Sequence, residues 1–466
     1  MHYLLTHLDD AARLTVVHLR LSLVPVLIGL AIALPLGMLV QRRRFARRLT
    51  TAVASVVFTI PSLALFVVLP MIIGTRILDE ANVMVALTAY TAALLVRAVL
   101  EALDAVPAQI SDAATAVGYP RLTRMMKVEL PLAVPVLIAG LRVVVVTNIA
   151  MVSVGSVIGI GGLGSWFTQG YQTGKSDQIL AGIIALFALA VAVDGLIVLG
   201  GRLVTPWAHA VRGGARRSVV APVVGGCPVN FVQRAIAYLL SADNWTGPVG
   251  LAARILEHLE YTGIAVGASA LIAVPVGLLI GHTGRGTLLV VGAVNGLRAL
   301  PTLGVLLFGT LLFGLGLGPS LVALMLLGVP ALLAGTYAGI ANVEPTVVDA
   351  ARAMGMTESQ VLLRVEVPNA LPLILGGLRS ATLQVVATAT VAAYASLGGL
   401  GRYLIDGIKE REFHLALVGA LTVAALALVL DGLLAVAVWA SVPGTGRLRR
   451  TYRPLPHRLA GTSYGR

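Results

Sequence analysis

The sequence has little charge, few aromatic residues and a single cysteine. Charged residues make up 12% of its 466 positions and aromatic residues 5%, whereas hydrophobic residues make up 58%. The mean hydropathy is +0.92. Such a composition is typical of a polytopic helical membrane protein and not of a soluble domain. Cys227 alone excludes a disulfide framework and a cysteine-rich metal site, and we expect no metal site.

The basic residues exceed the acidic ones, with a net charge of +13. Such an excess can indicate nucleic-acid binding, but here the arginines stand in short runs between apolar segments. Runs of this kind orient membrane helices. We therefore expect contact with a lipid bilayer and none with nucleic acid.

Ten apolar segments are long enough to cross a bilayer, which takes roughly 17–25 residues. They are 20–40, 51–73, 82–100, 132–157, 179–203, 260–281, 287–315, 319–341, 369–395 and 414–440. This pattern predicts an all-α, polytopic protein with two five-helix modules. The modules are 1–210 and 246–445, with a linker at 211–245 and a basic tail at 446–466.

The second module repeats the first. Early matches lie 240 residues apart, namely His18 and His258, Pro35 and Pro275, and Pro61 and Pro301. Later matches lie 237 residues apart, such as Glu129 and Glu366, and the Gly-Gly-Leu-Gly segments at 161–164 and 398–401. A net change of three residues between the second and third spans accounts for the difference.

A polar stretch interrupts the apolar pattern once in each module. We name Asp112–Pro131 the first knob and Asp349–Pro368 the second knob. The leading aspartate suits the start of a helix, and a glycine (Gly118 or Gly355) suits its left-handed end. We expect a second short helix next, before the proline that opens the following span. Duplication of the whole stretch favours a docking site over an ordinary polar loop.

The positions of the arginines predict which loops face the cytoplasm. The run Gln41–Arg48 contains five arginines and should stay in the cytoplasm. Both knobs and the C-terminal tail then lie in the cytoplasm, provided that the linker crosses the membrane once more. The best segment for that crossing is 218–241, although it contains several polar residues.

The pattern Asp-Ala-Ala-x3-Gly-x9-Val-x-Leu-Pro of the first knob resembles the EAA signature of type I ABC importer permeases. Aspartate replaces the usual glutamate in both copies. The segments 59–65, 129–135 and 161–164 are similar to the glycine betaine, carnitine and choline (osmoprotectant) branch. The sequence departs from this family in one respect: it contains both permease modules in one chain, whereas such permeases usually are two separate chains. The resemblance implies that the knobs contact an ATPase through Asp112, Ala113, Ala114, Gly118, Leu130, Pro131, Asp349, Ala350, Ala351, Gly355, Val367 and Pro368.

The resemblance also implies two kinds of partner, namely two copies of a cytoplasmic ABC ATPase subunit and an extracytoplasmic substrate-binding protein. Gly174-Lys175-Ser176 is not a P-loop, because Gln169 stands where that motif needs glycine. ATP and Mg would be held by the partner, so we expect no cofactor on this chain and no enzymatic activity of its own. We expect the binding protein to land on the two Gly-Gly-Leu-Gly segments and the loops 165–178 and 402–413, unless these glycines only end helices.

Four charged residues fall inside apolar segments, where charge needs a partner. Arg142 and Asp194 lie at similar depths in adjacent antiparallel spans, and Arg379 and Asp431 repeat them. We predict a structural ion pair in each module. The alternative is that each aspartate carries protons.

Polar residues of the fourth span in each module are candidates for lining a central path: Thr147, Asn148, Ser153, Gln384, Thr388 and Tyr394. The alternative, which we favour, is hydrogen bonding between helices. The resemblance and the repeats together predict the permease subunit of a binding-protein-dependent importer in the plasma membrane of a prokaryote. Its expected cargo is a quaternary ammonium osmoprotectant such as glycine betaine, carnitine or choline. The rival is a secondary transporter of a small amine or amino acid driven by an ion gradient.

Overall fold

The protein is helical throughout the residues that the computed structural model describes, which are 2–76, 79–205, 229–286, 292, 294, 296–395 and 397–442. No strand occurs in these ranges. Eight helical stretches are long and apolar enough to cross a membrane: Leu8–Val40, Glu80–Asp104, Arg121–Ile158, Ser176–Leu203, Leu251–Thr283, Leu317–Ala341, Glu358–Ala395 and Phe413–Ala440. The prediction of an all-α, polytopic tandem repeat is confirmed.

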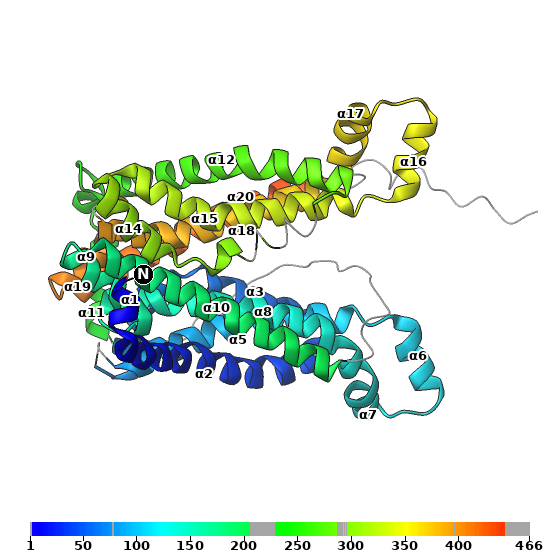
Figure 1. Ribbon diagram of the computed structural model, residues 1–466, viewed down its shortest axis with the longest axis horizontal. Helices are drawn as coiled ribbons and strands as arrows, with labels where there is room; N and C mark the ends of the chain where they lie inside the picture. The colour runs from blue at the N-terminus through cyan, green and yellow to red at the C-terminus, as the bar shows by residue number, and fades with distance from the viewer. Residues whose placement is uncertain are drawn as a thin grey trace, which may run out of the picture.

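The first module runs from α1 to α10. Its helices are α1 (His2–Thr6), α2 (Leu8–Val40), α3 (Arg44–Thr59), α4 (Ser62–Ile73), α5 (Glu80–Asp104), α6 (Ala108–Ala116), α7 (Arg121–Arg124), α8 (Leu130–Val154), α9 (Ser165–Gln172) and α10 (Ser176–Val204). α2, α5, α8 and α10 are the long helices, and they run side by side (Figure 1).

The second module repeats this order. Its helices are α11 (Val229–Leu240), α12 (Leu251–Thr283), α14 (Thr302–Phe313), α15 (Leu317–Ala341), α16 (Pro345–Ala353), α17 (Glu358–Val361), α18 (Val367–Ala392), α19 (Gly401–Lys409) and α20 (Phe413–Ala440). α12, α15, α18 and α20 thus correspond to α2, α5, α8 and α10.

The second predicted span of each module is not one long helix. In the first module, segment 51–73 is broken at Ile60, which has an extended backbone (φ −69°, ψ 130°). Pro61 causes the break, because proline lacks an N–H and disfavours the helical conformation of the residue before it. α4 and α14 have 12 residues each, about 18 Å of helix, which is short of the roughly 30 Å hydrocarbon core. Much of 287–295 lies outside the described residues.

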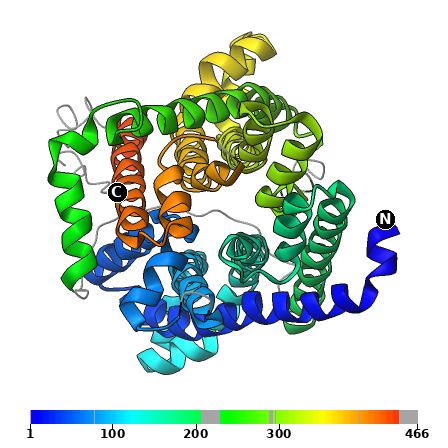
Figure 2. The same cartoon turned by 90° about the vertical axis from the view of Figure 1, so that its left-hand side faces the viewer.

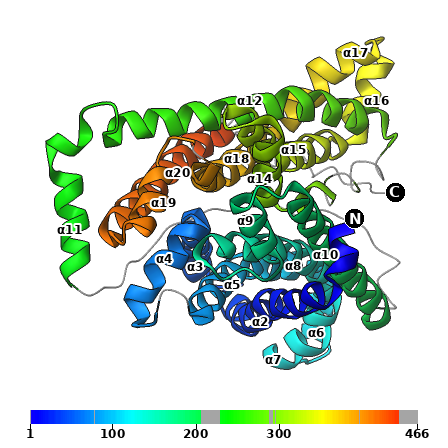
Figure 3. The same ribbon diagram turned by 60° about the vertical axis from the view of Figure 1, so that its left-hand side comes forward.

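The predicted linker crossing at 218–241 is wrong for the part that the structure describes. α11 has 12 residues and lies across the end of the bundle that is opposite the knobs, perpendicular to the long helices (Figures 2 and 3). α10 ends at the other end, on the same side as the knobs (Figure 1). Residues 206–228 lie outside the described residues, so a crossing there stays a prediction.

The two modules share one core. α14 of the second module contacts α9 and α10 of the first, and α4 of the first contacts α20 of the second. Leu303 and Leu307 of α14 are fully buried in the same cluster as Phe167 and Leu186 of the first module. The two copies therefore form one body around a shared interface, and both knobs project from the same end, called the knob end below (Figure 1).

Candidate functional site

Each knob begins with a helix that starts four residues before its aspartate. α6 follows Pro107, and α16 begins at Pro345, where proline suits a helix start because its missing N–H is not needed. Asp112 and Asp349 are therefore the fifth residues of these helices. The prediction that they stand at the helix start was wrong.

The predicted glycine turns are present. Gly118 and Gly355 have φ of +91° and +83°, the left-handed region that glycine enters without strain. The N–H of Tyr119 donates to the carbonyl of Ala114 (3.1 Å), and that of Met356 donates to the carbonyl of Ala351 (3.2 Å). These bonds close both helix ends in the same way.

The second short helix of each knob is not separate from the next span. In the first knob α7 passes through a π-helical turn, Met125–Glu129, directly into α8. In the second, α17 passes through Leu362–Glu366 into α18. The wide turn lies where Pro131 or Pro368 cannot donate to the carbonyl four residues earlier. Each knob is therefore rigidly continuous with a long helix.

Glu129 joins the parts of the first knob. Its carboxylate is buried and accepts hydrogen bonds from Nη2 of Arg42 (2.7 Å) and Nε of Arg124 (3.0 Å). It also accepts one from the hydroxyl of Ser111 in α6. One acceptor thus links the end of α2, the first knob helix and the start of the long helix that contains α8.

Glu366 has the same place in the second knob, but its partner there is a histidine. It is buried and lies 2.7 Å from Nδ1 of His282, whose Nε2 lies 3.2 Å from a carboxylate oxygen of Glu358. Glu358 in turn accepts two hydrogen bonds from Arg352 of α16, both 3.0 Å. This series of interactions connects α12 to both helices of the second knob.

The bond from Arg352 lowers the pKa of Glu358 below its ordinary value of 4.5. A carboxyl whose pKa is lowered in the fold contributes stability above the ordinary value and loses it as the pH falls. The link between α16 and α17 is therefore present at neutral pH.

The residues that anchor the knobs were missed from the sequence as site residues. Arg42 lies 87 residues from Glu129 and His282 lies 84 residues from Glu366, so no local motif brings either pair together. Arg124 and Glu358 lie inside the knobs themselves. The sequence feature that could have identified the residue joining the parts of each knob was the matching position of Glu129 and Glu366 in the two modules.

Both knobs expose small and apolar side chains at matching positions. Asp112, Ala113 and Gly118 are exposed, as are Asp349, Ala350 and Gly355, whereas Ala114 and Ala351 are buried; Leu130, Pro131 and Val367 are half-buried, and Pro368 is exposed. Val117 and its counterpart Met354 are 78% and 76% exposed. Large apolar side chains that project this far beyond the bundle form a surface suited to a protein partner.

The predicted intramembrane ion pairs are formed. Nε and Nη2 of Arg142 donate to the two carboxylate oxygens of Asp194 at 2.8 and 2.7 Å. Arg379 donates to Asp431 in the same way, at 2.5 and 2.6 Å. Two parallel bonds of this kind hold both side chains in a fixed geometry.

The polar residues of the fourth spans are split between helix contacts and cavities. Asn148 is fully buried and donates to Thr91 of α5 and to the backbone of Ser22 in α2. Ser153 is also buried. Thr147 and Gln384 bond within their own helices. Tyr394 lines a cavity between the modules, whereas Thr388 lines a small pocket within the second module.

The Gly-Gly-Leu-Gly segments are not an exposed landing surface, so that expectation was wrong. Residues 161–164 and 399–401 are buried. A Cβ on Gly162 would lie 2.9 Å from backbone atoms of His18 in α2. The segment therefore packs tightly against the first long helix, and the same contact recurs between Gly399 and His258.

The sequence signature of one family, the binding-protein-dependent transport system inner membrane component, matches residues 13–205 and 273–438. Both modules are therefore covered. The chain belongs to this family. An inner membrane component of a transport system is expected to span the membrane several times, in agreement with the eight apolar helices described above.

Individual relatives correspond to one module each. The chain is 36% identical to the choline transport system permease protein OpuBB of Bacillus subtilis over 181 residues, which are 39% of this chain and 83% of the relative. It is 36% identical to the glycine betaine/carnitine/choline transport system permease protein OpuCB of Bacillus subtilis over 180 residues, again 39% and 83%. It is 34% identical to the osmoprotectant import permease protein OsmW of Salmonella typhimurium over 189 residues, 40% of this chain and 88% of the relative.

Proposed function

We propose that the chain is the complete membrane-spanning part of an ATP-driven importer in a prokaryotic plasma membrane. The observation that supports this proposal is that two knobs, one from each module, project from the same end of a single body (Figure 1). Each knob has its own exposed apolar side chain, Val117 or Met354. Two equivalent docking surfaces in one chain suit two copies of one cytoplasmic ATPase subunit. ATP and Mg would be bound by that subunit.

We propose quaternary ammonium osmoprotectants as the substrate class. The support is the names of the relatives, which refer to choline, to glycine betaine with carnitine and choline, and to osmoprotectants. A separate binding protein would deliver the solute to the end opposite the knobs. A cavity of about 1470 Å³ opens there, lined by Asp79, Gln172, Tyr394 and Phe413 among others.

The geometry suggests how ATP hydrolysis moves the helices. Each knob is continuous with α8 or α18 through a π-turn, and each is fastened by a buried glutamate to the end of α2 or α12. Movement of an ATPase against a knob would therefore be transmitted to two long helices of that module. The two modules would then rock about their shared interface.

The experiment is copurification of the tagged chain from its native membrane, with Gly118→Asp and Gly355→Asp as variants. Both glycines have open space around them, so the substitutions strain the turn without disturbing the bundle. We expect an ATPase to copurify with the wild type and to be lost from the variants. An intact permease that retains no ATPase, with uptake that follows the proton gradient, would instead favour a secondary transporter.

A further inference from the structure

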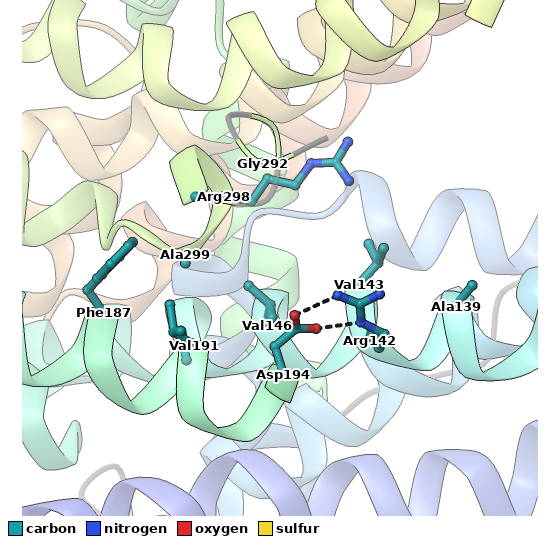
Figure 4. A pocket seen from close by; sticks show the side chains of 12 residues that line it. Ala139, Arg142, Val143, Val146, Phe187, Val191, Asp194, Gly292, Arg298 and Ala299 are labelled. Carbon is teal, nitrogen blue, oxygen red and sulfur yellow. Dashed lines mark hydrogen bonds and ion pairs between the residues drawn. The ribbon is translucent and has the colours of Figure 1, made fainter. Parts of the chain in front are cut away.

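A cavity of about 370 Å³ lies between the modules. α8 and α10 of the first module form one wall, with Arg142, Val146, Phe187 and Asp194. The residues just before α14 of the second module form the other wall, with Arg298 and Ala299 (Figure 4). Arg142 is the central residue of α8, so the cavity lies near the middle of the membrane. Its volume is in the range of small-molecule sites.

The charges in this cavity do not balance. Arg142 and Asp194 neutralise each other through their two hydrogen bonds. Arg298 lies across the cavity from them (Figure 4), and within the described ranges it takes part in no hydrogen bond or ion pair. An intramembrane guanidinium is costly unless an anion accompanies it. The cavity therefore has a net positive charge and the donors for a planar carboxylate.

The rest of the lining suits the other end of a small zwitterion. Val146, Val191 and Phe187 provide an apolar wall with one aromatic ring. Methyl groups of a quaternary ammonium pack well on such a wall, and an aromatic face also attracts the cation. Position 298 has no equivalent arginine in the first module, where Phe58 stands 240 residues earlier. A fused chain can therefore provide one site of this kind instead of two.

We infer that this cavity is a transit site for the transported solute, in which Arg298 binds the carboxylate. The inference rests on the proposed function and sharpens it. It predicts that solutes with a carboxylate, such as glycine betaine and carnitine, use Arg298, whereas choline, which has a hydroxyl in its place, does not.

The first test is uptake of labelled glycine betaine and choline by vesicles that contain the whole transporter with wild type, Arg298→Gln or Arg298→Lys. We expect Arg298→Gln to lower betaine uptake about tenfold or more relative to choline, since a charge-assisted bond is lost, and Arg298→Lys to lower it less. Arg202→Gln, an exposed arginine in the last turn of α10, is the matched control and should change neither. An equal effect of Arg298→Gln on both solutes, or no effect, overturns the inference. If the wild type carries neither solute, the proposed function has failed instead.

The second test keeps Arg298 intact and decides the case if Arg298→Gln is absent from the membrane. Val191→Cys in a Cys227→Ala background places one thiol in the cavity wall. We expect millimolar glycine betaine to slow labelling of this thiol by a maleimide, and choline to slow it less. Equal labelling with and without glycine betaine would overturn the inference.

Discussion

Arg42 and His282 occupy equivalent positions in the two modules, 240 residues apart, and each contacts the buried glutamate of its own knob. Nη2 of Arg42 lies 2.7 Å from Glu129, and Nδ1 of His282 lies 2.7 Å from Glu366. The two knobs are thus fastened at the same point by different side chains, an arginine and a histidine. A single fused chain allows this difference, because each copy of the module has its own sequence.

Glu129→Ala should destabilise the permease strongly. The substitution leaves the buried guanidinium of Arg124 without its carboxylate, and breaking a buried ion pair costs about 3 kcal/mol or more. The measurement is unfolding of the purified protein in detergent. Glu358→Ala, which removes an exposed pair, is the control and should have a much smaller effect. Equal stability of Glu129→Ala and wild type would show that the knob is held by other contacts.

Val117→Asp and Met354→Asp should each weaken ATPase binding without a change in stability. Both side chains are largely exposed, so the folded permease loses no core contact, whereas an apolar interface would have to bury a charge. Copurification and solute-stimulated ATP hydrolysis measure the effect. Val249→Asp, exposed at a distance from the knobs, should behave as wild type. Full ATPase coupling in both knob variants would exclude these residues from the docking surface.

The Arg142–Asp194 pair should tolerate exchange of its members. Asp194→Ala alone leaves an unpaired arginine in the membrane and should reduce the amount of inserted protein. The double variant Arg142→Asp with Asp194→Arg restores opposite charges and should recover insertion. Membrane content by immunoblot is the measurement. A double variant that fails to insert would contradict a structural role, and loss of transport in an inserted Asp194→Asn would favour proton transfer.

Gly162→Ala should destabilise the first module far more than Gly174→Ala. Both glycines have left-handed backbones, with φ of +47° and +68°, so both substitutions introduce similar backbone strain. Only at Gly162 would the new Cβ also meet the backbone of His18; at Gly174 the space is open. Thermal unfolding of the two variants measures the difference. Similar unfolding temperatures would show that α2 can move away from this segment.

Features that depend on repetition or on helical depth could be predicted from the sequence. The repeat of Asp112–Pro131 at Asp349–Pro368 predicted the two knobs. Counting residues from the span ends paired Arg142 with Asp194, because depth in a straight helix follows from its rise per residue. The helix-ending glycines followed from backbone sterics alone.

Features that depend on contacts distant in the sequence could not be predicted. Nothing near Glu129 indicates that Arg42 will reach it from the end of α2. The Gly-Gly-Leu-Gly segments read as exposed turns because their contact with His18 becomes visible only in three dimensions. Likewise, Arg298 stood unnoticed in an expected span, since only the packing of α14 against α10 turns it toward the other module.

The most direct test of the central claim is uptake of labelled glycine betaine by vesicles that contain this chain, its copurifying ATPase and the cognate binding protein. If the chain is the membrane part of an ATP-driven importer, uptake requires ATP and both partners, persists when an ionophore removes the ion gradients, and stops with Gly118→Asp or Gly355→Asp. Uptake that needs no ATP and collapses with the proton gradient would contradict the account.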